Sequence, residues 1–201
     1  MKIIFFSGLK GGTGKTTLSI YLCNYLHFHQ NKNVCLVNFD NHRLLSLLAQ
    51  QYHTPYPVIE CKIEEYNDTF LSGFNYDFLV VDMPGMASIE RSLLMQWEKA
   101  DAHILPYLSS SLDFYKLQLF FQLIQKQKLA LRNTFLLPNK FNKQAGTVMR
   151  ANLKQQSFFQ QSFHLPYIIN SSKIAAISFS PLNSTILNYL RPSFIAILNK
   201  S

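Results

Sequence analysis

A stretch that holds four of the chain's seven glycines constrains the fold more than any other feature. Residues 8–17 read GLKGGTGKTT, directly after the apolar run Ile3–Phe6 and directly before a segment with apolar residues at helical spacing. Glycines at this density let backbone N–H groups turn inward on an anion, and the start of a helix attracts the same negative charge. The order of strand, loop and helix therefore predicts a phosphate-binding loop in an α/β fold.

The second half of this loop carries the side chains that a nucleotide site needs. The P-loop pattern is G-x-x-x-x-G-K-[ST], and Gly14-Lys15-Thr16 matches its end, while Leu9 stands in place of its first glycine. Lys15 is expected to reach the β and γ phosphates, and the Thr16 hydroxyl is expected to bind Mg²⁺. The alternative is an ordinary glycine-rich turn with a solvated lysine, and the agreement of strand, loop and helix argues against it.

An additional lysine, Lys10, lies before the glycine pair of the loop. Residues 10–17, KGGTGKTT, resemble the deviant Walker A motif KGGxGKT[ST] of the ParA/MinD ATPases. The resemblance implies that Lys10 reaches across a nucleotide-sandwiched homodimer to the ATP of the partner subunit. A cation supplied in trans would stabilise the charge that develops in phosphoryl transfer, and it would couple hydrolysis to dimerisation.

Two aspartates at predicted strand ends extend the resemblance. Val34–Phe39 is a buried-strand pattern that runs into Asp40, where the family has D-x-D, and Asn38 replaces the first aspartate here. The resemblance gives Asp40 the task of orienting the attacking water, and a helix N-cap is a compatible structural role. An uncharged Asn38 is expected to weaken the coupling of this loop to Mg²⁺ and to slow turnover.

The second aspartate is Asp82, which ends the run Phe78–Val81 and is followed by Met-Pro-Gly. Such a run predicts a buried strand whose carboxylate emerges at the edge where open α/β sheets hold ligands. The segment resembles the Walker B form YD-hhhh-D-x-P of the family, which assigns Asp82 to Mg²⁺ through its water shell.

The remaining site residues come from the loop itself and from a later strand end. Asn139-Lys140, after the strand pattern Thr134–Pro138, resembles the Asn-[Lys/Arg] step that the family uses near adenine. The residues expected to bind ATP are Lys10, Gly11, Gly12, Thr13, Gly14, Lys15, Thr16, Thr17, Asn139 and Lys140. The expected catalytic residues are Lys10, Lys15 and Asp40, and the expected Mg²⁺ ligands are Thr16 and Asp82.

Strand and helix patterns alternate along the chain. This alternation predicts a three-layer α/β/α fold, in which a mostly parallel twisted sheet has helices on both faces, in a single domain spanning residues 1–201. Residues 52–76 are polar and proline-marked, and we interpret them as variable peripheral structure. Strands are expected at 3–6, 34–39, 78–82, 100–106, 134–138 and 163–169, and helices at 17–28, 44–48, 112–127, 143–154 and from 182 onward.

Two of these helices carry finer expectations. The helix at 112–127 is expected to be amphipathic. Its inward residues would be Leu112, Tyr115, Leu119, Leu123 and Ile124. In the last helix, Pro192 removes a backbone hydrogen bond, so we expect a kink there or a start nearer that residue.

Charge is divided unevenly along the chain. Residues 1–113 carry 8 Lys or Arg and all 11 acidic residues, a net charge of −3, whereas residues 114–201 carry 11 Lys or Arg and no acid. Such a segment favours an anionic partner, with nucleic acid as the first candidate, acidic lipid as the second and general basicity as the third reading. The last helix has only Arg191 and Lys200 as cations, which favours DNA over lipid.

The three cysteines, Cys23, Cys35 and Cys61, have no spacing that predicts a disulfide framework or a zinc site, so buried reduced thiols are expected. No secretory signal or membrane-spanning run is present in the sequence, which favours a cytoplasmic protein. The resemblance to the ParA/MinD ATPases and the basic second half of the chain imply that it is nucleoid-associated.

The leading interpretation is a ParA-like ATPase that uses ATP and Mg²⁺, dimerises on ATP binding, binds DNA without sequence preference and hydrolyses ATP slowly. The resemblance implies plasmid or chromosome partitioning and a ParB-like activating protein. A MinD-like membrane-associated ATPase and a nucleotide-clamped binding module with little hydrolysis are the alternatives. A third alternative, a small-molecule ligase or kinase, has no support, because no second substrate pocket can be recognised from the sequence.

Overall fold

The computed structural model describes the chain except for residues 40–43, 63–64, 68–69, 72, 86–97, 131–132, 141–150, 152, 154–161 and 166–177. Within the described part, seven parallel strands form one sheet in the order β3-β2-β4-β1-β5-β6-β7. The strands are β1 (Lys2–Phe6), β2 (Val34–Asn38), β3 (Val58–Glu60), β4 (Phe78–Asp82), β5 (Ala102–Tyr107), β6 (Thr134–Pro138) and β7 (Phe163–His164). The predicted parallel α/β architecture is confirmed.

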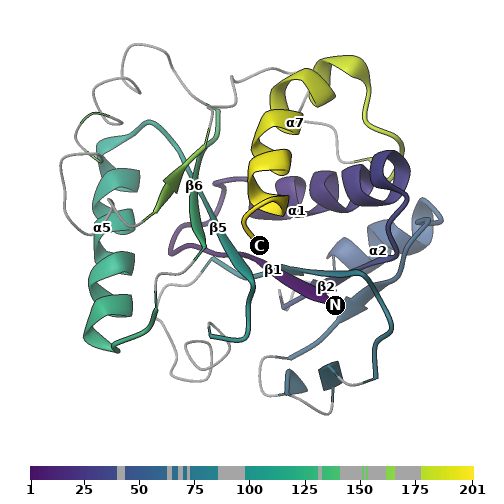
Figure 1. Ribbon diagram of the computed structural model, residues 1–201, viewed down its shortest axis with the longest axis horizontal. Coiled ribbons are helices and arrows are strands. Elements are labelled where there is room, and N and C mark those ends of the chain that lie inside the picture. Colours follow the sequence, from purple (N-terminus) through teal and green to yellow (C-terminus); the bar gives the residue numbers. More distant parts are fainter. Residues whose placement is uncertain are drawn as a thin grey trace.

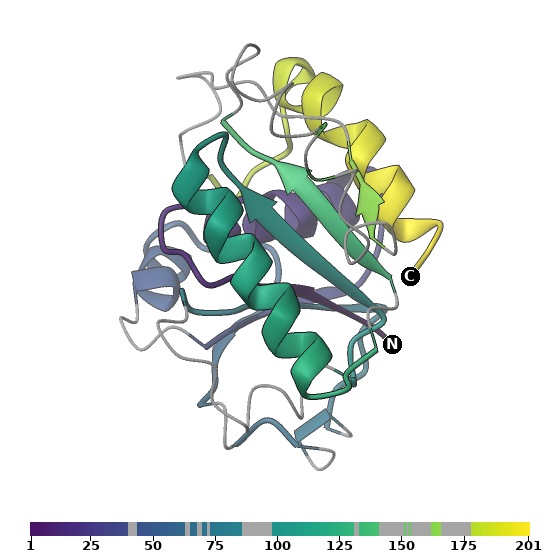
Figure 2. The same ribbon diagram turned by 90° about the vertical axis from the view of Figure 1, so that its left-hand side faces the viewer.

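Four α-helices flank this sheet in the described ranges, and Figures 1 and 2 show them on its two sides. They are α1 (Lys15–Asn24), α2 (Leu44–Gln51), α5 (Ser111–Lys126) and α7 (Ser184–Leu198), and a π-helical turn, Tyr25–His29, extends α1. α1 and α7 pack on one face of the sheet and α5 packs on the other, so two apolar layers enclose the strands.

The central strands are buried on both faces, which is why they appear in the sequence as continuous apolar runs. In β1, Ile4 and Phe6 face the layer that contains α1 and α7, and Ile3 and Phe5 face the layer that contains α5. β1 pairs in parallel with β4 on one side and with β5 on the other. The loop that follows β1 therefore leaves the middle of the sheet at its C-terminal edge.

The segment 52–76 is not purely peripheral, which corrects the expectation from its composition. It contains β3, which pairs in parallel with β2 and forms one edge of the sheet. The three residues of β3 are all half-buried. A strand this short, placed between prolines and acidic residues, has no apolar run long enough to be recognised.

The inward face of α5 also differs from the prediction. Leu112 and Tyr115 are 55% and 57% exposed, and the buried residues of the helix are Asp113, Leu117, Phe120, Phe121 and Ile124. Ser110 caps the helix by accepting a hydrogen bond from the Asp113 backbone N–H at 3.2 Å. The inward face therefore includes a polar residue, Asp113, beside four apolar ones, and the prediction was wrong for Leu112 and Tyr115.

The last helix begins at Ser184, where Asn183 Oδ1 accepts a hydrogen bond from the Ile186 backbone N–H at 3.0 Å. It continues without interruption through the exposed Pro192 to Leu198. Its apolar stripe packs into the same layer as α1, through Ile186, Leu190, Phe194 and Ile197. The predicted helix at 143–154 and most of the predicted strand 163–169 lie outside the described residues.

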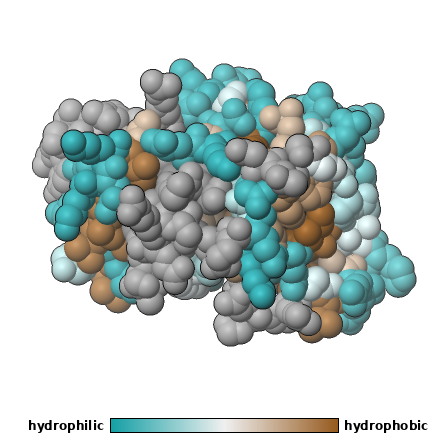
Figure 3. All heavy atoms as spheres, turned by 90° about the horizontal axis from the view of Figure 1, so that it is seen from below, coloured by the Kyte–Doolittle hydropathy of each residue, from teal (hydrophilic) through white to brown (hydrophobic). Residues whose placement is uncertain are grey.

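The two ends of the chain meet at the edge of the sheet opposite the glycine-rich loop (Figure 1). There, Lys2 Nζ donates a hydrogen bond to the Ser201 backbone oxygen at 2.6 Å. The surface seen from below in Figure 3 mixes hydrophilic and apolar atoms. No helix in the described ranges has the length and apolar character needed to cross a bilayer.

Candidate functional site: the glycine-rich loop and its neighbours

The loop between β1 and α1 has the backbone geometry of an anion site. Gly12 and Gly14 have φ values of 76° and 94°, a region that L side chains rarely adopt, and Gly14 is the N-cap of α1. Among the described residues no side chain caps this helix, and no acidic residue lies in its first turn. The positive end of the α1 dipole and its first N–H groups are therefore left for an anionic ligand.

Space around the loop glycines differs from one position to the next. A Cβ on Gly11 or Gly12 would meet no atom within 4 Å, so this side of the loop is open. A Cβ on Gly14 would lie 2.3 Å from Asn139 Nδ2, and a Cβ on Gly85 would lie 2.8 Å from the Gly11 backbone nitrogen. The loop is therefore held closely by the residue after β6 and by the segment after β4, and it is open where a phosphate group would enter.

Lys15 lies at the first position of α1 and is 6% exposed. Its Nζ donates a hydrogen bond to the Lys10 backbone oxygen at 3.0 Å, so the ammonium is held inside the loop. The Thr13 hydroxyl makes a longer contact of 3.5 Å with the same oxygen. Thr16 and Thr17 follow in the first turn of α1 and are half-buried. The predicted phosphate-binding side chains are thus together in one loop.

Asp82 ends β4, next to the strand that leads into the loop. It is paired in register with Phe6 of β1 on one side and with Asn38 of β2 on the other, and it is 1% exposed. The hydroxyl of Thr16 and the carboxylate of Asp82 are oxygen donors of the kind that Mg²⁺ prefers. Asn38 is also buried, at 2% exposure, and Asp40 lies outside the described residues.

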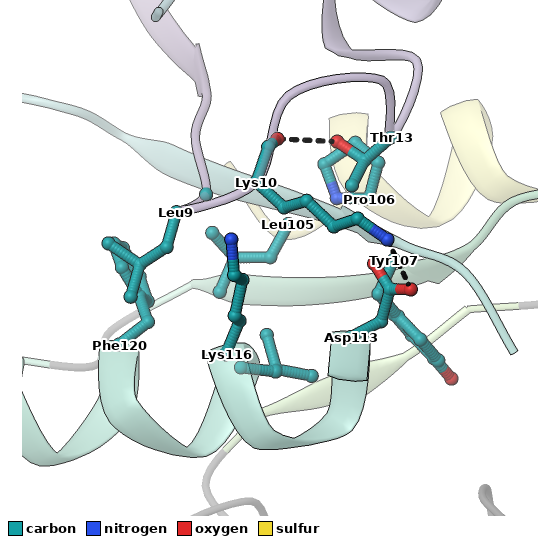
Figure 4. Close-up of a pocket in the computed structure, with 11 residues that line it drawn as sticks. Leu9, Lys10, Thr13, Leu105, Pro106, Tyr107, Asp113, Lys116 and Phe120 are labelled. Carbon is teal, nitrogen blue, oxygen red and sulfur yellow. Dashed lines mark hydrogen bonds and ion pairs between the residues drawn. The ribbon is translucent and has the colours of Figure 1, made fainter. Parts of the chain in front are cut away.

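The side chain of Lys10 makes an ion pair within its own chain. Its Nζ lies 2.8 Å from Asp113 Oδ2, and the two side chains are 26% and 2% exposed (Figure 4). The Ser110 hydroxyl donates a second hydrogen bond to the same carboxylate oxygen. Lys10 thus contributes its backbone oxygen to Lys15 and its ammonium to the first turn of α5.

Sequence reasoning did not find Asp113 as a site residue. A signal was present, because Ser110 followed three residues later by an acidic side chain resembles a capping box. That signal predicts a helix start, and it contains no information about a lysine 103 residues away. Asp113 Oδ1 has no hydrogen-bond partner among the residues that the structure describes.

A small pocket separates the loop from α5, and Figure 4 shows its lining. Leu9 and Lys10 line it from the loop, Tyr107 lines it from the end of β5, and Lys116 and Phe120 line it from α5. The Lys116 side chain points from the helix toward the loop, so a second cation lies beside the Lys10 and Asp113 pair.

Asn139 directly follows β6 and is 7% exposed. Its Nδ2 donates a hydrogen bond to the Thr13 backbone oxygen at 2.7 Å, and its Oδ1 accepts one from the Lys140 backbone N–H at 2.9 Å. Lys140 is exposed, with φ of 49°. The structure therefore brings Asn139 to the loop, where its amide contacts the protein backbone.

All three cysteines are buried free thiols, as the sequence predicts. Burial raises the pKa of Cys35 from 9.0 to about 12. Burial also raises the pKa of Cys23, with smaller contributions from Cys35 and from the Asp82 carboxylate. The thiols of Cys23 and Cys35 are therefore protonated near neutral pH.

Comparison with known proteins places this site in a family. Residues 4–179 match the model of the CobQ/CobB/MinD/ParA nucleotide binding domain. No match was found among curated proteins. The matched range includes the loop, Asp82, Asp113 and Asn139, so the family assignment covers the whole candidate site.

Solved structures with the same fold have low sequence identity to this chain. A protein from Borrelia burgdorferi B31 that is assigned to plasmid partition, with AMPPNP bound, is 19% identical with a TM-score of 0.71, over 98% of this chain and 96% of that one. A chain of the MinC:MinD cell division protein complex of Aquifex aeolicus is 18% identical with a TM-score of 0.72, over 100% of this chain and 97% of that one.

An ATP complex of a McdA variant from Cyanothece is 16% identical with a TM-score of 0.67, over 100% of this chain and 96% of that one. These likenesses support the fold, and the family match extends over most of the chain. The chain belongs to the CobQ/CobB/MinD/ParA family of nucleotide-binding domains.

Proposed function

We propose that this chain is a ParA-like ATPase that pairs with a second copy when ATP is bound, binds DNA without sequence preference and hydrolyses ATP slowly. The observation that carries the proposal is the arrangement of two lysines around one loop. The Lys15 ammonium is held inside the loop, and the Lys10 side chain, which is 26% exposed, makes an ion pair with Asp113. We treat residues 1–201 as one domain of this kind.

Each predicted side chain has a role in this proposal. Lys15 and the N–H groups at the start of α1 would bind the phosphates, and Thr16 and Asp82 would hold Mg²⁺, which neutralises phosphate charge when it is bound. Asp40 would position the water. Turnover would be slow because Asn38, beside Asp82 in the sheet, has no charge, and we expect a ParB-like protein to accelerate it.

Lys10 would exchange partners when two copies meet. In the unpaired chain, a single carboxylate neutralises its ammonium. A triphosphate from the second copy carries more negative charge than Asp113, so it can compete for the lysine once the two loops face one another. ATP occupancy would in this way control pairing, and pairing would complete the charge environment for hydrolysis.

The basic C-terminal half supports an anionic partner. Five of its six described cations are exposed, and Lys116 is half-buried. These six are Lys116, Lys126, Lys128, Lys140, Arg191 and Lys200. Lysine and arginine contacts to phosphates give affinity without sequence preference, through the release of counterions. A nucleoid-associated protein in plasmid or chromosome partitioning is the biological setting that we propose.

The packing of α7 favours DNA over a membrane. A helix that binds a bilayer surface must present its apolar face to lipid. The apolar face of α7 is already used, since Leu190, Phe194 and Ile197 are fully buried against the sheet and α1. The MinD-like alternative would therefore need another membrane-binding segment.

Size-exclusion chromatography with ATP, with ADP and without nucleotide tests the pairing step. The wild-type protein should elute as a dimer only with ATP. Lys15→Ala should abolish nucleotide binding, whereas Lys10→Ala should still bind ATP as a monomer and should fail to pair. If both variants lose nucleotide binding equally, Lys10 is part of the local phosphate cradle, and the proposed trans role is wrong.

Two further assays separate the rival functions. DNA gel shift with ATP, repeated over a range of salt concentrations, should show a steep salt dependence, and co-sedimentation with acidic liposomes should show no binding. Phosphate release, with and without DNA, distinguishes an ATPase from a nucleotide-clamped binding module. Asn38→Asp restores the negative charge that the family has at this position, and it should raise the rate of ATP hydrolysis. If neither the wild type nor this variant releases phosphate, the binding module is favoured.

A further inference from the structure

Three polar residues lie side by side at the edge of the sheet that holds the glycine-rich loop. Asn38 ends β2, and it is paired in register with Asp82 of β4 on one side and with Glu60 of β3 on the other. Residues paired in this way project to the same face of a parallel sheet, and Leu36, two residues before Asn38, faces the layer that contains α1. Glu60, Asn38 and Asp82 therefore form one row on that face.

Glu60 also contacts α2, the helix that follows β2 in the chain. The Ser46 hydroxyl, in the first turn of α2, donates a hydrogen bond to Glu60 Oε1. Leu45 and Ala49 pack α2 into the same layer as α1. A hydrogen bond to a carboxylate is charge-assisted, and Glu60 is half-buried, so this bond is stronger than an exposed one between neutral groups. It joins the start of α2 to the end of β3.

The end of β2 is bonded to the same short segment. The Cys61 backbone N–H, directly after Glu60, donates to the Asn38 backbone oxygen at 3.1 Å. β2 therefore ends, and α2 begins, at positions that are both bonded to the end of β3. Asp40, which lies outside the described residues, belongs to the connection between them, so Glu60 and its neighbour hold both ends of that connection.

We propose that Glu60 is a positioning residue for ATP hydrolysis, because it holds α2 and so fixes the connection that contains Asp40. The uncharged Asn38 gives this connection no ionic link to a bound cation, which makes a link to the protein more important. A water-positioning group must be held accurately, so a looser α2 would slow the hydrolysis step. The phosphates would be bound by the loop after β1, so nucleotide affinity should not depend on Glu60. The inference rests on the ATPase proposed above.

Kinetics of single and double variants test this role. Phosphate release at saturating ATP, with DNA present, gives kcat, and a titration with ATP gives KM. Glu60→Ala and Ser46→Ala should each lower kcat, roughly tenfold for one charge-assisted hydrogen bond, with an unchanged KM. The double variant should be no slower than Glu60→Ala, because both substitutions remove the same bond. Glu60→Gln keeps a side-chain oxygen as acceptor, so it should hydrolyse ATP at close to the wild-type rate.

Glu65→Ala is the matched control. Glu65 follows the same strand, and its Oε2 accepts a hydrogen bond from the Lys62 backbone N–H at 3.1 Å, within its own segment. This variant should have the wild-type kcat. Three results would overturn the inference: a wild-type kcat in Glu60→Ala, a tenfold rise in KM at unchanged kcat, or a Glu60→Gln variant as slow as Glu60→Ala. The last result would mean that the charge of Glu60 matters and its bond to Ser46 does not.

Hydrogen exchange in the nucleotide-free protein separates this inference from the proposed function. The amides of α2 should exchange faster in Glu60→Ala and Ser46→Ala than in the wild type, and at the wild-type rate in Glu65→Ala. Ser46→Ala deletes a single hydroxyl, so the comparison is still possible if Glu60→Ala fails to fold. Equal exchange in all these proteins would overturn the inference. A wild type that releases no phosphate, together with faster exchange in the variants, would refute the proposed ATPase and support the positioning of α2 by Glu60.

Discussion

The ion pair between Lys10 and Asp113 predicts an asymmetric effect of removing each partner from the nucleotide-free protein. Lys10→Met keeps the apolar stem and deletes the ammonium, which leaves the Asp113 carboxylate charged in a position that is 2% exposed. Asp113→Asn deletes the charge on the buried side and leaves a lysine whose side chain is 26% exposed, so its ammonium can turn to water. The lysine substitution should therefore cost more than the aspartate substitution.

The magnitudes follow from burial. Leaving a buried charge without its partner costs about 3 kcal/mol, the lower end of the usual range, because the Ser110 hydroxyl still donates to the carboxylate. Asp113→Asn should cost about 1 to 1.5 kcal/mol, from one charge-assisted hydrogen bond and a negative charge in the first turn of α5. In the double variant no charge remains, so it should regain about 1 kcal/mol relative to Lys10→Met.

Urea unfolding of the four proteins, followed by circular dichroism without nucleotide, measures these free energies. Lys116→Met is the matched control, because Lys116 lines the same pocket and makes no ion pair with any residue that the structure describes. A coupling energy below about 0.3 kcal/mol, typical of many exposed ion pairs, would refute the reasoning. So would an aspartate substitution that costs more than the lysine substitution, because the burial argument fixes their order.

Three further predictions concern other parts of the molecule. Gly85→Ala should weaken nucleotide binding without unfolding the protein, because the new methyl group would press on the Gly11 backbone nitrogen. A tripolyphosphate titration measures the affinity, and circular dichroism checks that the variant is folded. Folding raises the pKa of Cys35 from 9.0 to about 12, so as the pH rises the unfolded thiol loses its proton before the folded one does. The free energy of unfolding should therefore fall above about pH 9, by up to about 1.4 kcal/mol per pH unit from this group. Urea titrations in reductant at several pH values should show a shallower fall for Cys35→Ala than for the wild type. Phe194→Ala, which truncates a fully buried side chain of α7, should lower the free energy of unfolding by about 3 to 5 kcal/mol and leave ATP affinity unchanged, and an equal loss of both would mean that α7 supports the site directly.

The elements that the sequence predicted well are those with local signals. β1, β2, β4, β5 and β6 were recognisable because strands buried on both faces are continuous apolar runs. The loop was recognisable because glycines, a lysine and a threonine are adjacent in the chain. These local features predict that Lys15 and Asp82 lie at the same edge of the sheet.

The contacts that complete the site have no local signal. Lys10 meets Asp113 across 103 residues, and Asn139 meets Thr13 across 126, so only the folded sheet brings them together. The orientation of α5 was predicted incorrectly for a related reason. Its sequence has apolar residues on both sides, and the buried side includes a polar residue, Asp113, which an apolar pattern does not reveal. β3 was missed because a three-residue edge strand is defined by its pairing with β2 and not by a pattern in its own sequence.

The contact between Lys2 and Ser201 has a practical consequence for watching the molecule at work. Because both ends emerge on the side of the sheet remote from the loop, a fluorescent protein fused to either one would project away from the face through which two copies would associate. Donor and acceptor fusions of this kind could report pairing by energy transfer in solution or in living cells. A short linker between the two ends would also give a circularly permuted chain, with its new termini in another loop.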